Sequence, residues 1–127
     1  CGNGIRLSNT QNQLKLFLEK YNIPAVFSYG GVDLIDFYSK YWIGVIGVKG
    51  TRAGNFAVQN CNLLLCLGVC LNTPQVGYMG EKFARKAKKI VVDLDVENHK
   101  QDIGVKIDKI IECELGEFFN YMDIKYD

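Results

Sequence analysis

The stretch that decides the fold reads GVKGTRAGNFAVQNCNLLLCLG and occupies residues 47–68. Thr51 is the predicted N-cap of a helix, and the glycines before it allow the backbone to approach another group closely. Leu63 to Leu67 is an apolar run without alternation, which is typical of a parallel strand covered on both faces. A glycine turn, a capped helix and a buried strand in this order predict one unit of an α/β fold.

Strands and helices alternate on either side of this stretch. Parallel strands are predicted near residues 24–28, 43–48, 62–67, 89–94 and 107–112, and helices over residues 8–21 and 115–122. Ser8 or Asn9 is the predicted cap of the first helix, while residues 72–80 are predicted as a loop and residues 81–87 as a short helix. The alternation predicts a single α/β domain over residues 1–127, with a Rossmann-like doubly wound parallel sheet of strand order 3-2-1-4-5-6.

The first strand of such a sheet is missing from the sequence. Cys1-Gly2-Asn3-Gly4 reads as the glycine turn that leaves a strand and enters a helix, yet no strand stands before it. In the order 3-2-1-4-5-6 that first strand is central. We therefore expect a fragment of a larger protein, with a gap or a foreign strand in the middle of its sheet.

Composition and charge argue against several classes of function. The 127 residues carry a formal net charge of +1, which gives no reason to expect binding to nucleic acid or to an anionic membrane surface. No apolar run is long enough to span a bilayer, and no signal peptide opens the sequence. The five cysteines form no CxxC pair, which favours a reduced, cytoplasmic protein and argues against a zinc site.

The order of several short segments resembles the central (middle) domain of thiamine-diphosphate-dependent enzymes, in particular the acetolactate synthase large subunit and its relatives. The segments that carry the resemblance are Gly2-Asn3-Gly4, Ile23-Pro24, and residues 44–51, 55–58, 64–68, 83–84, 87–90 and 92–95. It extends from Gly2 to about Met122 and rests on joint order and spacing, because no one of these motifs is decisive.

The resemblance implies a role within a three-domain enzyme. In that family one flanking domain supplies the glutamate that activates the cofactor, and the other carries a Gly-Asp-Gly…Asn signature that holds Mg²⁺ and diphosphate. This chain has neither, so we expect no catalytic residue in it, no activity from it alone, and the thiamine diphosphate and Mg²⁺ sites outside it. The parent would be a transferase or lyase that acts on 2-oxo acids or on a carbon–carbon bond beside a carbonyl, assembled as a homodimer or homotetramer.

A cofactor groove is expected over the C-terminal ends of the strands, where open α/β sheets bind ligands. Its predicted lining is Gly2, Asn3, Gly4, Ser28, Lys49, Gly68, Val69 and Asp93. Acetolactate synthases hold FAD at this place, but Cys70 and Pro74 stand here where FAD-binding relatives carry arginines, so FAD is not favoured.

Two alternatives stay open at this groove. Gly2 and Gly4 either approach a phosphate or only form the tight turn between strand and helix. Asp93 and Asp95 either bind a ribose hydroxyl or cap the following turn. The alternative function is a stand-alone Rossmann-like module that binds FAD or NAD.

Three further groups have both a structural and a functional interpretation. A solvated helix face, rather than an anion site, is predicted for the basic cluster Lys82, Arg85, Lys86, Lys88 and Lys89. His99 is predicted to lie at the surface. The last group is aromatic and consists of Phe37, Tyr38, Tyr41 and Trp42. It is predicted to be either part of the core or an interface with another domain or subunit, and the interface is favoured.

Overall fold

The predicted strands are present, and all of them are parallel. A computed structural model, which describes residues 1–99 and 103–125, contains β1 (Ala25–Phe27), β2 (Trp42–Val45), β3 (Leu63–Leu67), β4 (Lys88–Asp93) and β5 (Lys109–Glu112). β1 pairs with β2, and β4 lies between β3 and β5. Each strand lies at its predicted place, which confirms the prediction of a parallel α/β fold.

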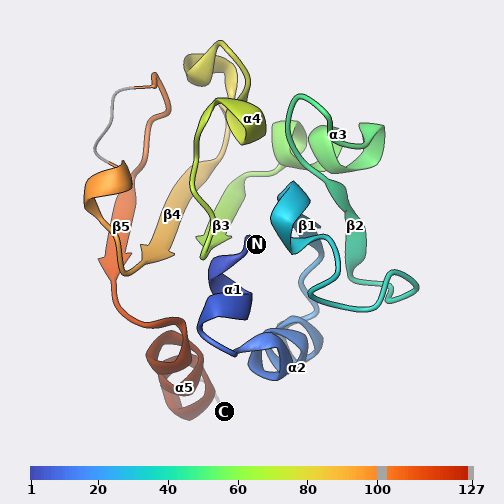
Figure 1. The fold of residues 1–127 in the computed structure, drawn as a ribbon, viewed down its shortest axis with the longest axis vertical. Helices are drawn as coiled ribbons and strands as arrows, with labels where there is room; N and C mark the ends of the chain where they lie inside the picture. Colours follow the sequence, from blue (N-terminus) through green and yellow to red (C-terminus); the bar gives the residue numbers. More distant parts are fainter. Residues whose placement is uncertain (100–102, 126–127) are drawn as a thin grey trace.

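The strands form two sheets rather than one. β1 and β2 make a two-stranded sheet, and β3, β4 and β5 make a three-stranded sheet. Within the described part of the chain no strand joins β1 to β3, and the N-terminal residue lies between them (Figure 1). The neighbours within each sheet agree with the predicted order, whereas the complete six-strand order stays a prediction.

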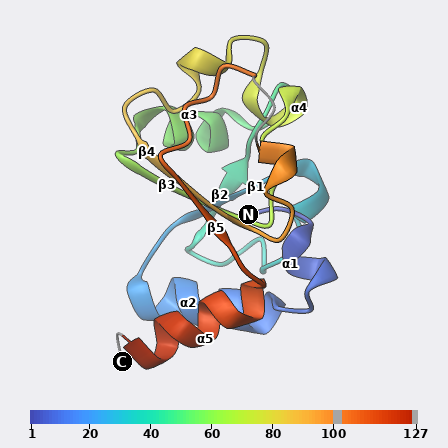
Figure 2. The same cartoon turned by 90° about the vertical axis from the view of Figure 1, so that its left-hand side faces the viewer.

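Helices cover both faces of the strands (Figures 1 and 2). α1 (Gly4–Leu7), α2 (Gln11–Tyr21) and α5 (Leu115–Lys125) lie on one face, and α3 (Arg52–Asn60) and α4 (Thr73–Val76) lie on the other. Single turns of 3-10 helix form η1 (Tyr29–Gly31), η2 (Gly80–Lys82) and η3 (Glu97–His99). Helices on both faces of parallel strands are the doubly wound arrangement that the sequence predicts.

Each face of the strands has its own hydrophobic core. Leu67 and Val92 point to one face, where they pack with Phe17 of α2 and the aromatic residues of α5. Cys66 and Val91 point to the other face, where they pack with Val58 of α3. Successive residues of a strand face opposite sides, so one continuous apolar run supplies both cores.

The stretch over residues 47–68 folds as one compact unit around Thr51. The Thr51 hydroxyl oxygen accepts hydrogen bonds from Gly54 N at 3.1 Å and from Val45 N at 3.1 Å, so it caps α3 and ties it to β2. A Cβ on Gly54 would stand 2.8 Å from Val45 N, closer than real contacts allow. Only glycine lets the helix lie this near the strand, and the predicted cap is confirmed.

Three predicted boundaries are wrong. The helix expected over residues 8–21 is present as α2 but begins later, at Gln11, because Asn9 has a left-handed φ of +55°; Thr10, not Ser8 or Asn9, stands directly before it. The loop predicted over residues 72–80 contains α4, and residues 81–87 hold only the end of η2 and turns. The predicted burial of residues 63–67 on both faces is incomplete as well, because Leu63 is 56% exposed.

Candidate functional site

Four predicted site residues come together where α1 meets the end of β3. Gly4 N donates to Gly68 O at 2.9 Å, and Gly2 N donates to Leu67 O at 3.1 Å. A Cβ on Gly4 would stand 2.7 Å from Gly68 Cα, and one on Gly2 would stand 2.8 Å from Val69 Cα. Glycine is therefore required at both positions for backbone packing. This supports the interpretation of Gly2 and Gly4 as a tight turn rather than as a phosphate-binding site. With four residues, α1 also offers an incoming anion little of a helix dipole.

Asn3 and Ser28 lie beside this glycine cluster, and the neighbouring cation is already paired. Ser28 is buried, and its N–H donates to the carbonyl of the first residue at 2.9 Å. The Arg6 guanidinium donates to Asn3 Oδ1 at 2.8 Å and to Gly30 O at 2.8 Å, and it forms an ion pair with Asp33. Sequence reasoning missed Arg6, whose role is to fasten α1 to η1.

Lys49 does not join the cluster. It is exposed on the loop of residues 47–50, which is held elsewhere: Val48 N donates to Pro74 O at 2.9 Å. The Asn55 side chain accepts from Gly47 N at 2.9 Å and donates to Gly47 O at 3.0 Å. Among the described residues, no hydrogen bond or ion pair connects Lys49 with the other predicted site residues.

Asp93, the last residue of β4, is engaged by groups of its own chain. Its Oδ2 lies 2.9 Å from His99 Nε2, and its Oδ1 accepts from Asp95 N at 3.2 Å. Asp95 Oδ1 accepts in turn from Asn98 N at 3.3 Å. These contacts support the turn-capping interpretation over ribose binding.

His99 is buried, so the prediction of a surface histidine is wrong. The Asp93 carboxylate, six positions earlier, holds the ring inside, although the sequence around His99 is polar. Its Nδ1 is buried, and no described residue forms a hydrogen bond with it. The one feature of the sequence that could have indicated a buried His99 is the carboxylate of Asp93 at the end of the preceding strand.

The electrostatic environment near Cys70 opposes an anion. The pKa of the Cys70 thiol is raised, first by partial burial and then by the negative charges of Asp93 and Asp95. Two carboxylates therefore act at the place where the resemblance expects arginine. Since Arg6 is paired with Asp33 and Lys49 lies apart, the residues present do not fit the diphosphate of FAD.

The described residues contain no cluster of side chains suited to a metal ion. Over residues 1–99 and 103–125, no group of three or more His, Cys, Asp or Glu side chains could hold a metal ion. Burial raises the pKa of the thiols of Cys61, Cys66 and Cys113, to about 11 for Cys66, so these are thiols rather than reactive thiolates. No helix in these ranges is both long and apolar enough to cross a bilayer.

The basic cluster lies at the start of β4, away from the glycine cluster. All of its members except Lys82 line a cavity of about 410 Å³, together with Lys106, Phe83 and the carboxylates of Glu81 and Asp108. The predicted solvated helix face is wrong for Lys89, which is buried and whose ammonium donates to Ala87 O at 3.2 Å. The cavity wall mixes both signs of charge.

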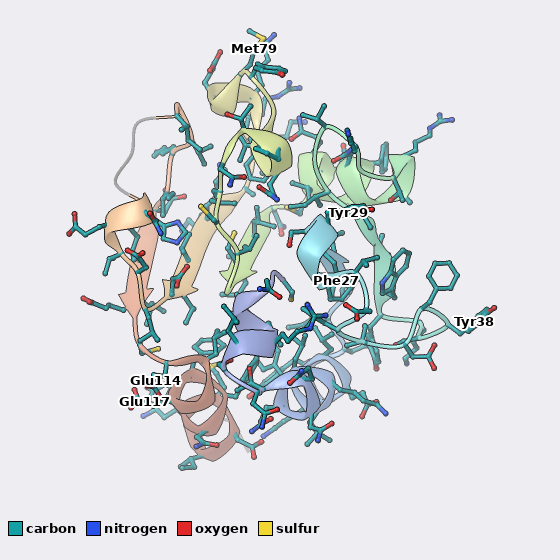
Figure 3. All side chains as sticks on the ribbon, in the orientation of Figure 1. Phe27, Tyr29, Tyr38, Met79, Glu114 and Glu117 are labelled. Atoms are coloured by element: carbon teal, nitrogen blue, oxygen red, sulfur yellow. The ribbon has the colours of Figure 1, made fainter. Side chains whose placement is uncertain are left out.

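The aromatic group is divided between the surface and the edge of the core. Phe37 is 63% and Tyr38 90% exposed, and Figure 3 shows Tyr38 pointing away from the body of the molecule. Tyr41 and Trp42, the latter at the start of β2, are partly buried and pack against the core. The Phe37 ring centre lies 4.6 Å from that of Trp42, whose indole Nε1 donates to Val32 O at 3.0 Å. The role of the exposed Phe37 and Tyr38 as an interface stays a prediction.

Comparison with known proteins points to one family of enzymes. Residues 1–115 match the family model described as "Thiamine pyrophosphate enzyme, central domain". The chain is 32% identical over 94 residues to the acetolactate synthase isozyme 2 large subunit of Escherichia coli (strain K12), a match that covers 74% of this chain and 17% of that protein.

Two further relatives carry similar names. The acetolactate synthase large subunit of Pyropia yezoensis is 34% identical over 94 residues, covering 74% of this chain and 16% of that protein. The probable acetolactate synthase large subunit of Methanococcus aeolicus is 25% identical over 115 residues, covering 91% of this chain and 19% of that protein. The chain spans less than a fifth of the length of each of these relatives.

Proposed function

The chain belongs to the thiamine pyrophosphate enzyme central-domain family, and from that premise we propose that it is the middle, structural domain of an acetolactate-synthase-like enzyme. On this proposal residues 1–127 are one domain of a larger protein, and two further domains bring thiamine diphosphate and Mg²⁺. The whole protein is a transferase or lyase acting on 2-oxo acids or on a carbon–carbon bond beside a carbonyl. When bound, the thiamine cofactor supplies the electron sink for such reactions.

The observation that carries the proposal is that polar groups at the C-terminal edge of the strands bind one another. Asp93 is engaged by His99, and Arg6 is engaged by Asp33. Gly4 and Gly68 pack backbone against backbone. An edge whose groups are used in this way positions neighbouring domains, and it leaves few donors for a cofactor.

We further propose that this domain does not hold FAD. Any nucleotide that approached would meet the eight predicted lining residues, among which Lys49 is the one cation, and that side chain lies apart from the rest. Each missing charge-assisted hydrogen bond to the diphosphate removes about 1.5–3 kcal/mol. Two such losses weaken binding by a factor on the order of a hundred or more.

Three features of the whole protein follow from the proposal. It assembles as a homodimer or homotetramer, and the exposed aromatic group meets another domain or subunit. It resides in the cytoplasm, where the reducing environment suits the five free cysteines. It binds neither nucleic acid nor a membrane.

Calorimetric titration with FAD tests the ligand part of the proposal. We expect no saturable binding of FAD or NAD to the chain, and measurable FAD binding by the double variant Cys70→Arg/Pro74→Arg. The matched control is Cys70→Gln/Pro74→Gln, which adds side chains of similar length without charge and should bind no better than the parent. Tight FAD or NAD binding by the unmodified chain would support the stand-alone nucleotide module instead.

Activity measurements test the domain assignment. The 127-residue chain with thiamine diphosphate, Mg²⁺ and a 2-oxo acid should show no turnover, and the full-length gene product that contains it should consume the 2-oxo acid. Full-length protein that lacks a Gly-Asp-Gly…Asn segment, or that shows no dependence on thiamine diphosphate, contradicts the assignment.

A further inference from the structure

The start of β4 lies at the end of the strands opposite to α1 (Figure 1), and the cavity of about 410 Å³ opens there. Two segments bound it: residues 81–89 lead from η2 into β4, and residues 104–108 lead into β5. A Cβ on Gly80 would collide with the carbonyl oxygen of Ile103, so the two segments pack backbone against backbone. The cavity therefore has one wall from each segment and lies apart from the glycine cluster.

Hydrogen bonds hold both walls in place. The Gln59 side chain of α3 accepts from Ala84 N at 2.7 Å and donates to Lys82 O at 3.0 Å. Lys89 N donates to Asp108 Oδ2 at 2.8 Å, and Asp108 N donates to Lys89 O at 2.9 Å. The first pair of bonds fastens one wall to α3, and the second pair joins the two walls. The cavity is thus formed before any ligand enters it, as small-molecule sites usually are.

Lys89 brings a buried positive charge to this cavity. The residue is only 3% exposed, and its ammonium donates to Ala87 O at 3.2 Å. An ammonium has three N–H donors, and within residues 1–99 and 103–125 no carboxylate forms an ion pair with this one. A buried charge without a counter-ion is costly, so the group that Lys89 lacks is an anion.

The rim of the cavity adds further cations. The cations that line it are Arg85, Lys86, Lys88, Lys89 and Lys106, and the carboxylates are Glu81 and Asp108. Cations therefore outnumber carboxylates five to two. Asp108 is already engaged, since its Oδ2 accepts from Lys89 N and its Oδ1 lies 3.9 Å from Lys106 Nζ. The sequence favoured a solvated face for the basic cluster, but a solvated face does not explain why Lys89 is buried.

We propose that this cavity binds a small anion that carries a phosphate group, with the phosphate oxygens on the Lys89 ammonium. A phosphate monoester has nearly two negative charges and three strong acceptor oxygens, so it can bond Lys89 and the rim cations together. A carboxylate supplies one charge and two oxygens. Phe83 and Ala87 also line the cavity and offer apolar contact to the rest of a phosphorylated molecule. The site does not depend on the proposed role of the domain in a thiamine-diphosphate enzyme.

Calorimetric titration of the chain at low ionic strength tests the proposal. The probes are inorganic phosphate and phenyl phosphate, and we expect saturable binding to one site. Lys89→Met keeps the length of the side chain and removes its charge, so it should weaken binding about tenfold or more. The matched control is Lys82→Met, which removes one charge from the same basic cluster but outside the cavity and should weaken binding less than about twofold. No saturable binding, or equal weakening by both variants, overturns the proposal.

Further ligands identify the kind of anion. Phenyl phosphate that binds about tenfold tighter than inorganic phosphate supports a phosphorylated small molecule, whereas equal affinities support free phosphate. Succinate carries two charges without a phosphate group, and binding as tight as that of phosphate overturns the phosphate assignment. A single-stranded oligonucleotide of about twelve nucleotides is the last ligand. If it binds more tightly than either probe and is weakened equally by both variants, the cluster is a nucleic-acid surface and the proposal is wrong.

Two measurements keep the test open if a protein folds poorly. Should Lys89→Met not fold, amide resonances of the unmodified chain are followed instead. Phosphate should then shift the Lys89 and Gly104 amides and leave that of Leu115 in α5 in place, and no shift at saturation overturns the proposal. Should the chain itself not fold, the same titrations use the full-length protein that contains it, with thiamine diphosphate and Mg²⁺ already bound, so that only a separate site is measured.

Discussion

Replacing Gly4 by alanine tests whether the glycine turn at the start of the chain serves packing or ligand approach. The new Cβ would stand 2.7 Å from Gly68 Cα and 2.9 Å from Gly68 O, both of them backbone atoms that cannot rotate away. Relieving this contact moves α1 from β3 and weakens the 2.9 Å bond from Gly4 N to Gly68 O. Overpacking costs about 1–3 kcal/mol and a lost hydrogen bond about 0.5–1.5 kcal/mol, which together give about 2–4 kcal/mol.

Urea unfolding followed by circular dichroism measures this loss. With a denaturant slope of about 2 kcal/mol per molar, the midpoint of Gly4→Ala should fall by about 1–2 M. The matched control is Gly116→Ala in α5, where the new Cβ lies 3.9 Å from Thr10 Cγ2, an ordinary contact. That substitution should leave stability unchanged or raise it by up to about 1 kcal/mol, because alanine favours the helix.

The comparison of the two variants can refute the packing argument. Equal midpoints for Gly4→Ala and Gly116→Ala would mean that α1 is free to move, and the turn would regain its interpretation as a ligand cradle. A Gly4→Ala chain that keeps its stability but loses binding of a nucleotide would point the same way.

Two further outcomes are expected from urea unfolding. Thr51→Ala should cost about 1–2 kcal/mol because α3 loses its cap, and Thr51→Ser should restore most of it. His99→Ala should cost about 2–4 kcal/mol through a cavity and a lost partner for Asp93. The matched control Lys49→Ala replaces an exposed side chain and should cost less than about 0.5 kcal/mol.

Most of the fold could be predicted because its strands are short apolar runs separated by strong breakers. The runs at residues 63–67 and 88–93 carry both cores, so burial on two faces leaves no polar alternation to mislead the assignment. The predicted start of the helix over residues 8–21 was wrong for a local reason, since α2 begins at Gln11. Asn9 adopts a left-handed backbone and Ser8 bonds back to Gly4 O, which ends one helix before the next begins. Helical spacing of apolar residues continues across that break and conceals it.

The site was less predictable because its chemistry depends on tertiary contacts. Gly4 and Gly68 are 64 positions apart in the sequence. Only their contact in the folded structure shows that each position requires glycine because the other lies against it. His99 reads as a surface residue from its polar neighbours, yet the carboxylate of Asp93 makes its burial possible. Lys49 has the right residue type for a diphosphate but the wrong place, because Pro74 holds its loop against α4.

The hydrogen-bonding groups of Asp93, at the C-terminal edge of the strands, are bound by the chain itself. At the C-terminal edge, Asp93 already has His99 and the amide of Asp95 as partners, so a ligand there must displace bonds that the chain has already formed.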